Sequence, residues 1–256
     1  MLRKLLQLYR FFSDETPYYA ASLSFFTIFS LLPLLALLIS VVSTMPTFAT
    51  YLDLLMVHIM DFINPTHSQS LAKNIQSFLV NTKELGSIGV FYLLFVFTMF
   101  FRDYEHVVNR IFGSQSRSIV KMFFMYLVLM LLIPILFALF IFVSTLSFLQ
   151  FSFSVHIFTF LFIWSMFVII FMISPNTKVS FKAAVIGSLL TVISLSFVKK
   201  MFGIYVISNT TYSTIYGSFS IALFFFLWIY ISWSIYLYGI KLSALINNYG
   251  NRYENK

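Results

Sequence analysis

Two adjacent lysines interrupt an otherwise apolar segment and are the first candidates for chemistry. Lys199 and Lys200 lie inside the segment 181–207. A charged group within a bilayer costs free energy, so such a residue is a candidate functional residue. Lys199 follows Phe181 by 18 residues, which is about 27 Å of helix and therefore near the edge of a hydrocarbon core about 30 Å thick. Two interpretations stay open: the ammonium groups reach the outer interface, or one of them lines a cavity.

A second polar group lies at the end of the apolar segment 87–110. Arg102, Glu105 and Asn109 have the i, i+3, i+7 spacing of one helical face. An Arg102–Glu105 pair at the inner membrane boundary would lock neighbouring helices or bind a lipid headgroup. The alternative is a local ion pair at a solvated helix end.

Ser30 and Pro33 form a third candidate, within the apolar segment 18–42. Proline removes one backbone donor and bends a helix, which exposes a carbonyl group that can line a substrate path. A bend that serves only packing is the commoner case.

The sequence contains no recognisable catalytic or metal-binding arrangement. There are no cysteines, and the four histidines are dispersed. It has neither a Gly-rich phosphate loop nor a GxSxG nucleophile elbow. We therefore expect no catalytic, cofactor-binding or metal-binding residues, and a protein that is not an enzyme.

Composition places these residues in a membrane protein. The chain is 60% hydrophobic and 9% charged, whereas soluble domains have about 25% charged residues. The apolar segments are long enough to cross a bilayer as helices, and they are 18–42, 87–110, 122–148, 155–173, 181–207 and 216–244. The expected fold is an all-α, polytopic transmembrane bundle of about six spanning helices, forming a single membrane domain over 1–256.

The distribution of Lys and Arg predicts the orientation. Twelve of the 16 basic residues fall in alternate connections and at the termini, and two fall in the remaining connections. The positive-inside rule then places both termini in the cytoplasm. The segment 1–16 is expected to be an amphipathic cytoplasmic N-terminus, 47–86 an extracytoplasmic connection with short interfacial helices, and 245–256 a cytoplasmic tail.

The net charge of +8 indicates the partners. Basic residues in cytoplasmic connections contact anionic lipid headgroups. We therefore expect membrane lipids, anionic ones above all, as partners, and no nucleic acid. A homo-oligomer is compatible with this architecture.

Several short motifs resemble one family. They are Phe202–Gly203–Ile204–Tyr205, Tyr216–Gly217, Leu227–Trp228–Ile229–Tyr230, Gly239 with Leu242, the stretch 20–35 that contains Ser30 and Pro33, and Glu105 with Asn109. In this order they resemble the BrkB/YihY virulence-factor family of bacterial inner-membrane proteins. Phe25 stands where Tyr is more usual, and Phe112 replaces a common Trp.

The resemblance covers nearly the whole chain and implies six helices with both termini in the cytoplasm. It adds Tyr205 and Tyr216 to the candidate residues. It does not fix an activity. Members were once labelled ribonuclease BN, which is mistaken for this family, and others have been linked to serum resistance and to export of lipid or lipid A precursors.

Three functions follow, in decreasing order of support. The first is transport or flipping of an amphipathic, anionic lipid or envelope precursor. The second is a non-transporting membrane scaffold or envelope factor. The third is an RNA-processing enzyme, which the ordinary positive-inside charge of the connection 102–121 does not favour.

Overall fold

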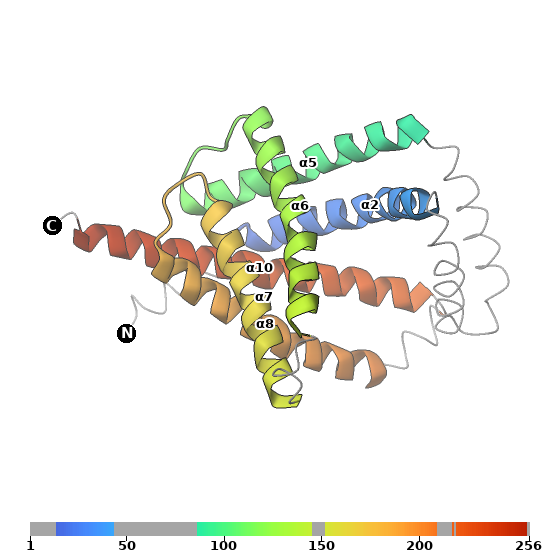
Figure 1. Cartoon of the computed structure of the whole chain (residues 1–256). Helices are drawn as coiled ribbons and strands as arrows, with labels where there is room; N and C mark the ends of the chain where they lie inside the picture. Colours follow the sequence, from blue (N-terminus) through green and yellow to red (C-terminus); the bar gives the residue numbers. More distant parts are fainter. Residues whose placement is uncertain (1–13, 44–85, 145–151, 209–216, 218, 255–256) are drawn as a thin grey trace. The chain divides into compact units, whose positions relative to one another are not determined.

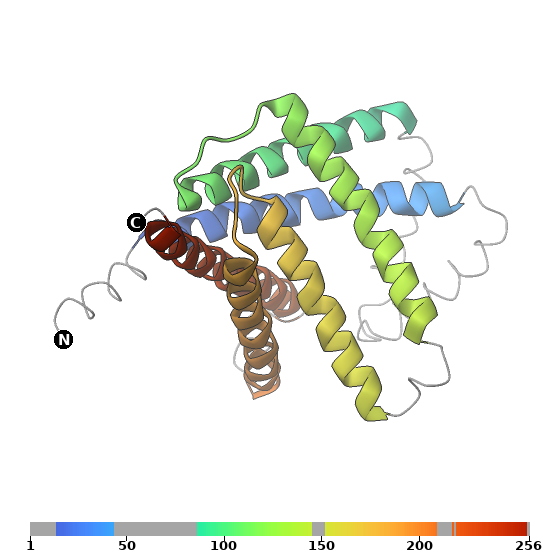
Figure 2. The same ribbon diagram turned by 60° about the vertical axis from the view of Figure 1, so that its left-hand side comes forward.

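All regular elements in the described part of the chain are α-helices. The computed structural model describes residues 14–43, 86–144, 152–208, 217 and 219–254. The helices are α2 (Thr16–Ser43), α5 (Gly86–Phe112), α6 (Ile119–Ser144), α7 (Ser152–Ile173), α8 (Phe181–Ser208) and α10 (Phe219–Glu254) (Figure 1, and turned by 60° in Figure 2). These ranges contain no strand, so the predicted all-α class is confirmed.

Each predicted apolar segment overlaps one of these helices, with one clear difference at the C-terminus. α10 continues to Glu254, so most of the segment 245–256, predicted as a tail, is helical. The predicted N-terminal amphipathic segment up to Ser13, the connection 47–85 and Tyr216 lie outside the described residues.

The start of α2 has a local cause. The Asp14 carboxylate accepts a hydrogen bond from the backbone N–H of Thr16 at 3.2 Å, and Pro17 occupies the first turn, where its missing N–H costs nothing. α2 continues through Pro33 as one unbroken helix. Within it, the Ser30 hydroxyl donates to the Thr27 carbonyl at 3.0 Å.

The end of α5 is a Schellman motif built on a glycine. Gly113 has φ +68°, a left-handed conformation that glycine adopts without strain. Its N–H donates to the Arg110 carbonyl at 3.2 Å, and the Ser114 N–H donates to the Asn109 carbonyl at 2.9 Å. This turn directs the chain from α5 into the segment 114–118, which brings Arg117 back towards α5.

The Cα positions divide the chain into two compact units. One unit comprises 1–25 and 101–256, and the other comprises 26–100. Large side chains that are fully buried in the first unit include Leu23, Val108, Phe171, Leu237 and Ile240. In the second unit, the rings of Phe29 and Tyr92 meet edge to face at 6.3 Å.

Small residues allow α8 and α10 to approach very closely. A Cβ atom added to Gly187 would lie 2.8 Å from the Ser243 Cβ, and one added to Gly239 would lie 1.8 Å from the Thr191 Oγ1. Close backbone approach through small residues is typical of helix pairs in membranes. α8 also contacts α7, because the Ser188 Oγ of α8 accepts a hydrogen bond from the indole N–H of Trp164 in α7, at 3.1 Å.

Two helical stretches in the described residues are long and apolar enough to cross a bilayer. They are Phe181–Val206 and Leu223–Asn248, and shorter apolar stretches are Ile119–Leu129 and Ile157–Ile173. Large apolar side chains point outwards on the same helices, such as Phe197 (63% exposed) and Ile204 (58% exposed). Such surfaces are typical of proteins that contact lipid. The number of spans and their orientation stay predictions.

Candidate functional site

A buried carboxylate at the end of α5 is held by donors from three parts of the chain. Glu105 is 1% exposed. Its carboxylate accepts hydrogen bonds from the Arg117 guanidinium at 3.0 Å, the Tyr126 hydroxyl at 2.6 Å and the Asn109 amide at 2.8 Å. The backbone N–H of Arg117 adds a fourth, at 2.9 Å. We call Glu105, Asn109, Arg117 and Tyr126 the Glu105 cluster. Desolvating a carboxylate is costly unless its acceptor sites are filled in this way.

Arg117 also clamps the C-terminus of α7. Its guanidinium donates to the carbonyl groups of Ile173, Ser174 and Pro175, at 2.9, 2.7 and 2.8 Å. The last carbonyl groups of a helix have no partner within the helix and carry its negative dipole end. One partly buried arginine therefore joins the Glu105 carboxylate of α5 to the connection between α7 and α8.

Asn109 closes the same cluster from the other side. It is fully buried, and its Oδ1 accepts hydrogen bonds from the backbone N–H of Asn176 at 2.6 Å and from the Ser114 hydroxyl at 2.7 Å. The Asn176 side chain in turn donates to the Gln115 carbonyl at 2.9 Å. The two polar connections, 113–118 and 174–180, are thus held together.

Tyrosines extend this network to α10. The hydroxyl of Tyr104 forms hydrogen bonds with the hydroxyl of Ser174, at 2.8 Å, and with that of Tyr236. The Tyr104 ring packs edge to face on Tyr126, with centroids 5.6 Å apart. Together with these tyrosines and Ser174, the Glu105 cluster connects α5, α6, the C-terminus of α7 and α10. Its groups use their hydrogen-bonding capacity on one another, which is the property of a structural lock rather than of a reactive site.

The helical extension of α10 positions a cap for α8. Asn247 is 3% exposed. Its Oδ1 accepts the backbone N–H of Ser180 at 2.8 Å, and its Nδ2 donates to the Lys178 carbonyl at 3.1 Å. Ser180 itself accepts the N–H of Ala183 at 3.3 Å, as an N-cap residue does. This tertiary contact explains why α10 extends past its apolar part.

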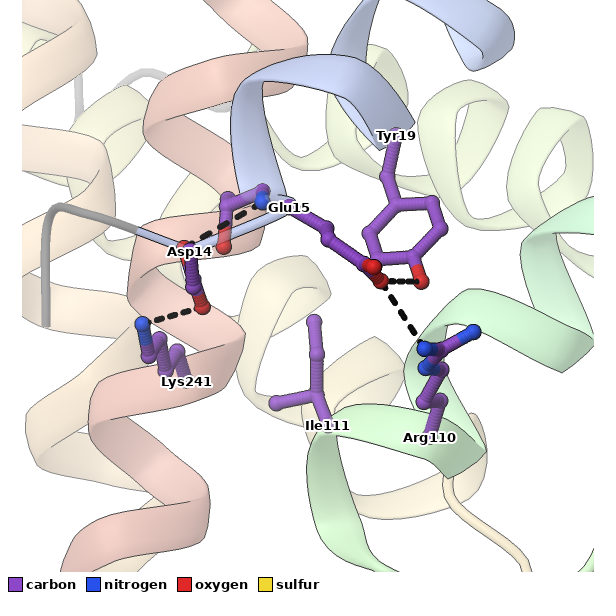
Figure 3. A pocket seen from close by; sticks show the side chains of 7 residues that line it. Asp14, Glu15, Tyr19, Arg110, Ile111 and Lys241 are labelled. Atoms are coloured by element: carbon purple, nitrogen blue, oxygen red, sulfur yellow. Dashed lines mark hydrogen bonds and ion pairs between the residues drawn. The ribbon is translucent and has the colours of Figure 1, made fainter. Parts of the chain in front are cut away.

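A charged cavity lies beside the start of α2 and the end of α5. It has a volume of about 350 Å³ and is lined by Asp14, Glu15, Thr16, Tyr19, Arg110, Ile111 and Lys241 (Figure 3). Glu15 pairs with Arg110 at 2.9 Å, and Asp14 pairs with Lys241. We call it the acid–base cavity, because two carboxylates and two cations line it.

Because of the Asp14–Lys241 pair, the stability of the folded protein is expected to change with pH in the acid range. Burial raises the pKa of the Asp14 carboxyl, but hydrogen bonds from Lys241 and Thr16 and the Lys241 charge outweigh burial, so the pKa lies below the ordinary 3.8. A lowered pKa stabilises the folded state above the unfolded value, and this contribution is lost as the pH falls through the folded pKa. Asp14→Asn is therefore expected to destabilise the protein by at most about 1 kcal/mol at neutral pH, because the pair is partly exposed, and by less below about pH 3.8.

The check is thermal unfolding of wild type and Asp14→Asn in the same detergent across the acid range. The two melting curves should converge as the pH falls. A melting-temperature difference that stays constant through pH 3.8 would contradict the assignment.

A second cavity of about 310 Å³ lies between α8 and α10. Its lining combines hydroxyl groups with apolar side chains and consists of Leu190, Thr191, Ser194, Ile235, Tyr238, Gly239 and Leu242. It lies on the face where the two helices approach each other most closely.

The structure separates the candidate residues that the sequence suggested. Glu105 and Asn109 are buried together, but Arg102 is exposed. The arginine that pairs with Glu105 is Arg117, so the expected Arg102–Glu105 pair is wrong. Lys199 and Lys200 are both exposed on α8, and neither contributes to the two cavities described above.

Of the remaining candidates, Tyr205 is 41% exposed, and its ring contacts those of Phe202 and Phe224. Ser30 and Pro33 lie in the part of α2 that belongs to the second unit.

Sequence reasoning missed Arg117, Tyr126, Ser174 and Asn176. In the sequence, Arg117 is one of several basic residues in a connection, and nothing local distinguishes it from the others. Tyr126 could have been found, because it places a hydroxyl group in an apolar helix. A buried Tyr hydroxyl usually has a hydrogen-bond partner.

Comparison with known proteins identifies the family. Residues 8–256 match the family described as Virulence factor BrkB. A UPF0761 membrane protein of Mannheimia succiniciproducens is 27% identical over 205 residues, which cover 76% of this chain and 71% of the relative. No solved structure shows significant similarity.

Two further relatives agree. A UPF0761 membrane protein of Alteromonas mediterranea is 29% identical, covering 75% of this chain and 68% of the relative. One of Haemophilus influenzae is 28% identical, covering 74% of both. The resemblance inferred from the sequence motifs is thereby confirmed: the chain belongs to the BrkB virulence-factor family and is an integral membrane protein.

Proposed function

We propose that the protein binds an amphipathic, anionic lipid on the outer surface of α8 and moves it between the two leaflets of the bacterial inner membrane. The observation that carries the proposal is the pair Lys199 and Lys200, both exposed. Large apolar side chains in the same part of α8 are exposed too: Phe197 (63%), Met201 (47%) and Ile204 (58%).

This combination of side chains matches the two parts of an anionic lipid. Each basic residue near an anionic membrane surface contributes about 1 kcal/mol of attraction. The neighbouring apolar side chains contact acyl chains. Adjacent helical residues point about 100° apart, so the two ammonium groups approach different sides of α8 and either can meet a headgroup.

The lipid path we propose runs over the helix surface rather than through the cavity between α8 and α10. On α8 that cavity is lined by Leu190, Thr191 and Ser194. Helical rotation of about 100° per residue puts Lys199 and Lys200 on other sides of the helix. The lysines therefore meet lipid directly from the bilayer.

A second candidate function is a non-transporting scaffold, and a specific observation favours it. The Glu105 cluster and the close approach at Gly239 fix α5, α7, α8 and α10 against one another. A scaffold needs such rigidity, whereas a transporter of the alternating-access type moves one group of helices against another.

The test is lipid movement in liposomes that contain the purified protein and a fluorescent phosphatidylglycerol. Wild type should accelerate the exchange of the probe between leaflets. Replacing both Lys199 and Lys200 with Gln should slow it by about thirtyfold, because two contributions of about 1 kcal/mol each are lost.

Lys182→Gln is the matched control, because Lys182 is also an exposed lysine of α8 and should leave the rate unchanged. A wild-type protein without effect on exchange would eliminate transport and leave the scaffold. Equal rates for wild type and the double variant would eliminate the lysines as headgroup contacts.

A further inference from the structure

We propose that the acid–base cavity binds the phosphoethanolamine headgroup of a zwitterionic membrane lipid. The proposal goes beyond lipid transport: it concerns another ligand class and another part of the molecule, and it stands whether or not the protein moves lipid. The cavity lies where the first turn of α2, the last turns of α5 and the later part of α10 meet (Figure 3).

The cavity presents both signs of charge in equal number. The carboxylates of Asp14 and Glu15 face the guanidinium of Arg110 and the ammonium of Lys241. Figure 3 shows the Glu15–Arg110 pair and the Asp14–Lys241 pair as separate contacts, with Ile111 between them. The formal charges of these four side chains cancel.

This balance selects the ligand class. A purely anionic headgroup would gain from the cations but would be repelled by the carboxylates at similar range. A zwitterion satisfies both sets at once. Its phosphate fits the planar, forked donors of Arg110, which suit phosphate oxygens, and its ammonium group fits the Glu15 carboxylate.

The two ion pairs differ in how easily a ligand can open them. Arg110 and Glu15 have side chains that are 54% and 62% exposed, and exposed pairs of this kind contribute little. Lys241 is only 17% exposed in its pair with Asp14. A headgroup inserted between Glu15 and Arg110 therefore replaces their weak contact by two charged contacts. Glu15 also accepts a hydrogen bond from the Tyr19 hydroxyl, and the Asp14–Lys241 pair stays in place.

An aromatic ring adds affinity for the cationic end. Tyr19 lies in the cavity, and the Arg110 guanidinium sits over its ring at 5.5 Å from the centroid. When a phosphate draws Arg110 away, the ring face can accept the ligand's ammonium group, an interaction that aromatic rings commonly make with cations.

A lipid is the source that the surroundings favour. The volume of about 350 Å³ is that of a small-molecule site. Exposed aromatic side chains follow along α2, with Tyr18 at 74% and Phe25 at 61% exposure, and in a membrane protein they offer contacts to acyl chains. A free phosphoethanolamine would leave them unused.

The experiment measures binding to the purified full chain in detergent. The probes are short-chain phosphatidylethanolamine, the phosphatidylglycerol of the same chain length, and soluble phosphoethanolamine, each titrated by change in tryptophan fluorescence and by native mass spectrometry. We expect wild type to bind the phosphatidylethanolamine at least about tenfold more tightly than the phosphatidylglycerol, as expected when a headgroup loses one charged contact.

Two variants locate the site. Arg110→Gln should weaken phosphatidylethanolamine binding by about tenfold. Arg102→Gln is the matched control, because Arg102 is an exposed arginine of the same helix outside the cavity, and it should change binding less than about twofold. If Arg110→Gln does not fold, Glu15→Gln is tested in its place. The preference of wild type for phosphatidylethanolamine over phosphatidylglycerol tests the proposal without any variant.

Three outcomes would overturn the proposal. They are equal or tighter binding of phosphatidylglycerol by wild type, unchanged binding by a folded Arg110→Gln variant, and an equal loss in Arg102→Gln. Soluble phosphoethanolamine that binds as tightly as the lipid would overturn the lipid as the source. None of these results depends on the rate of lipid movement in liposomes.

Discussion

Replacing Glu105 with alanine is expected to lower the free energy of unfolding by about 3–5 kcal/mol. The Arg117 guanidinium, whose side chain is only 16% exposed, would lose its carboxylate partner and remain as an uncompensated charge. The hydroxyl of Tyr126 and the amide of Asn109 would lose the same acceptor. Buried donors without partners cost more than the lost hydrogen bond itself.

The measurement is denaturant unfolding in detergent micelles, followed by tryptophan fluorescence. Asp103→Ala is the matched control, because Asp103 is an acidic residue of the same helix that is only partly buried. It should change the free energy of unfolding by no more than about 0.5 kcal/mol. Equal effects of the two variants would mean that the Glu105 cluster does not hold the helices together.

A double variant separates the charge from the packing. Glu105→Leu combined with Arg117→Met removes both charges, so it should cost less than Glu105→Ala alone. Full recovery is not expected, because Arg117 also donates to the carbonyl groups of Ile173, Ser174 and Pro175. A double variant less stable than the single variant would contradict the role of charge.

The helices could be predicted from the sequence because a long apolar segment is recognisable from its own residues alone. Glu105 and Asn109 could be found for the same reason, as polar residues on one face of one helix. Their partners could not. Arg117 lies 12 residues beyond Glu105, and the Ser174 carbonyl that it binds lies another 57 residues on. The turn at Gly113 and the packing of α7 bring Arg117 to both of these partners. Residue spacing along one helix does not show such a contact.

The C-terminus is a second place where a contact distant in the sequence, and not local composition, determines the structure. The polar composition after Ala244 favours a tail by local criteria, but Asn247 binds the backbone before α8 and keeps the segment helical. The lysine pair is different again. The sequence left two orientations open for Lys199 and Lys200, and the structure leaves both side chains exposed, because neither points at the neighbours that α8 packs against.

Replacing Gly239 with alanine is expected to lower the free energy of unfolding by about 2–3 kcal/mol. The new Cβ would lie 1.8 Å from Thr191 Oγ1, 3.1 Å from Thr191 Cβ and 3.3 Å from Phe171 Cζ. Rotation of the threonine hydroxyl alone cannot relieve the contact, because the Cβ atom of Thr191 is also too close. α8 and α10 would have to move apart, and they would lose contacts along their shared face.

Gly203→Ala is the matched control. It separates the effect of the clash at Gly239 from the general effect of replacing a glycine in a helix. Gly203 lies in α8, and among the described residues no atom beyond its neighbouring helical backbone lies within 4 Å of an added Cβ, so alanine there should stabilise the helix by about 0.5–1 kcal/mol. Adding Thr191→Ala to Gly239→Ala removes the nearest clashing atom and should recover about 1–2 kcal/mol as coupling between the two sites. The two variants are compared by unfolding in the same micelles. A loss in both glycine variants, or no coupling between Thr191 and Gly239, would mean that the close approach of α8 and α10 does not limit the size of the residue at this position.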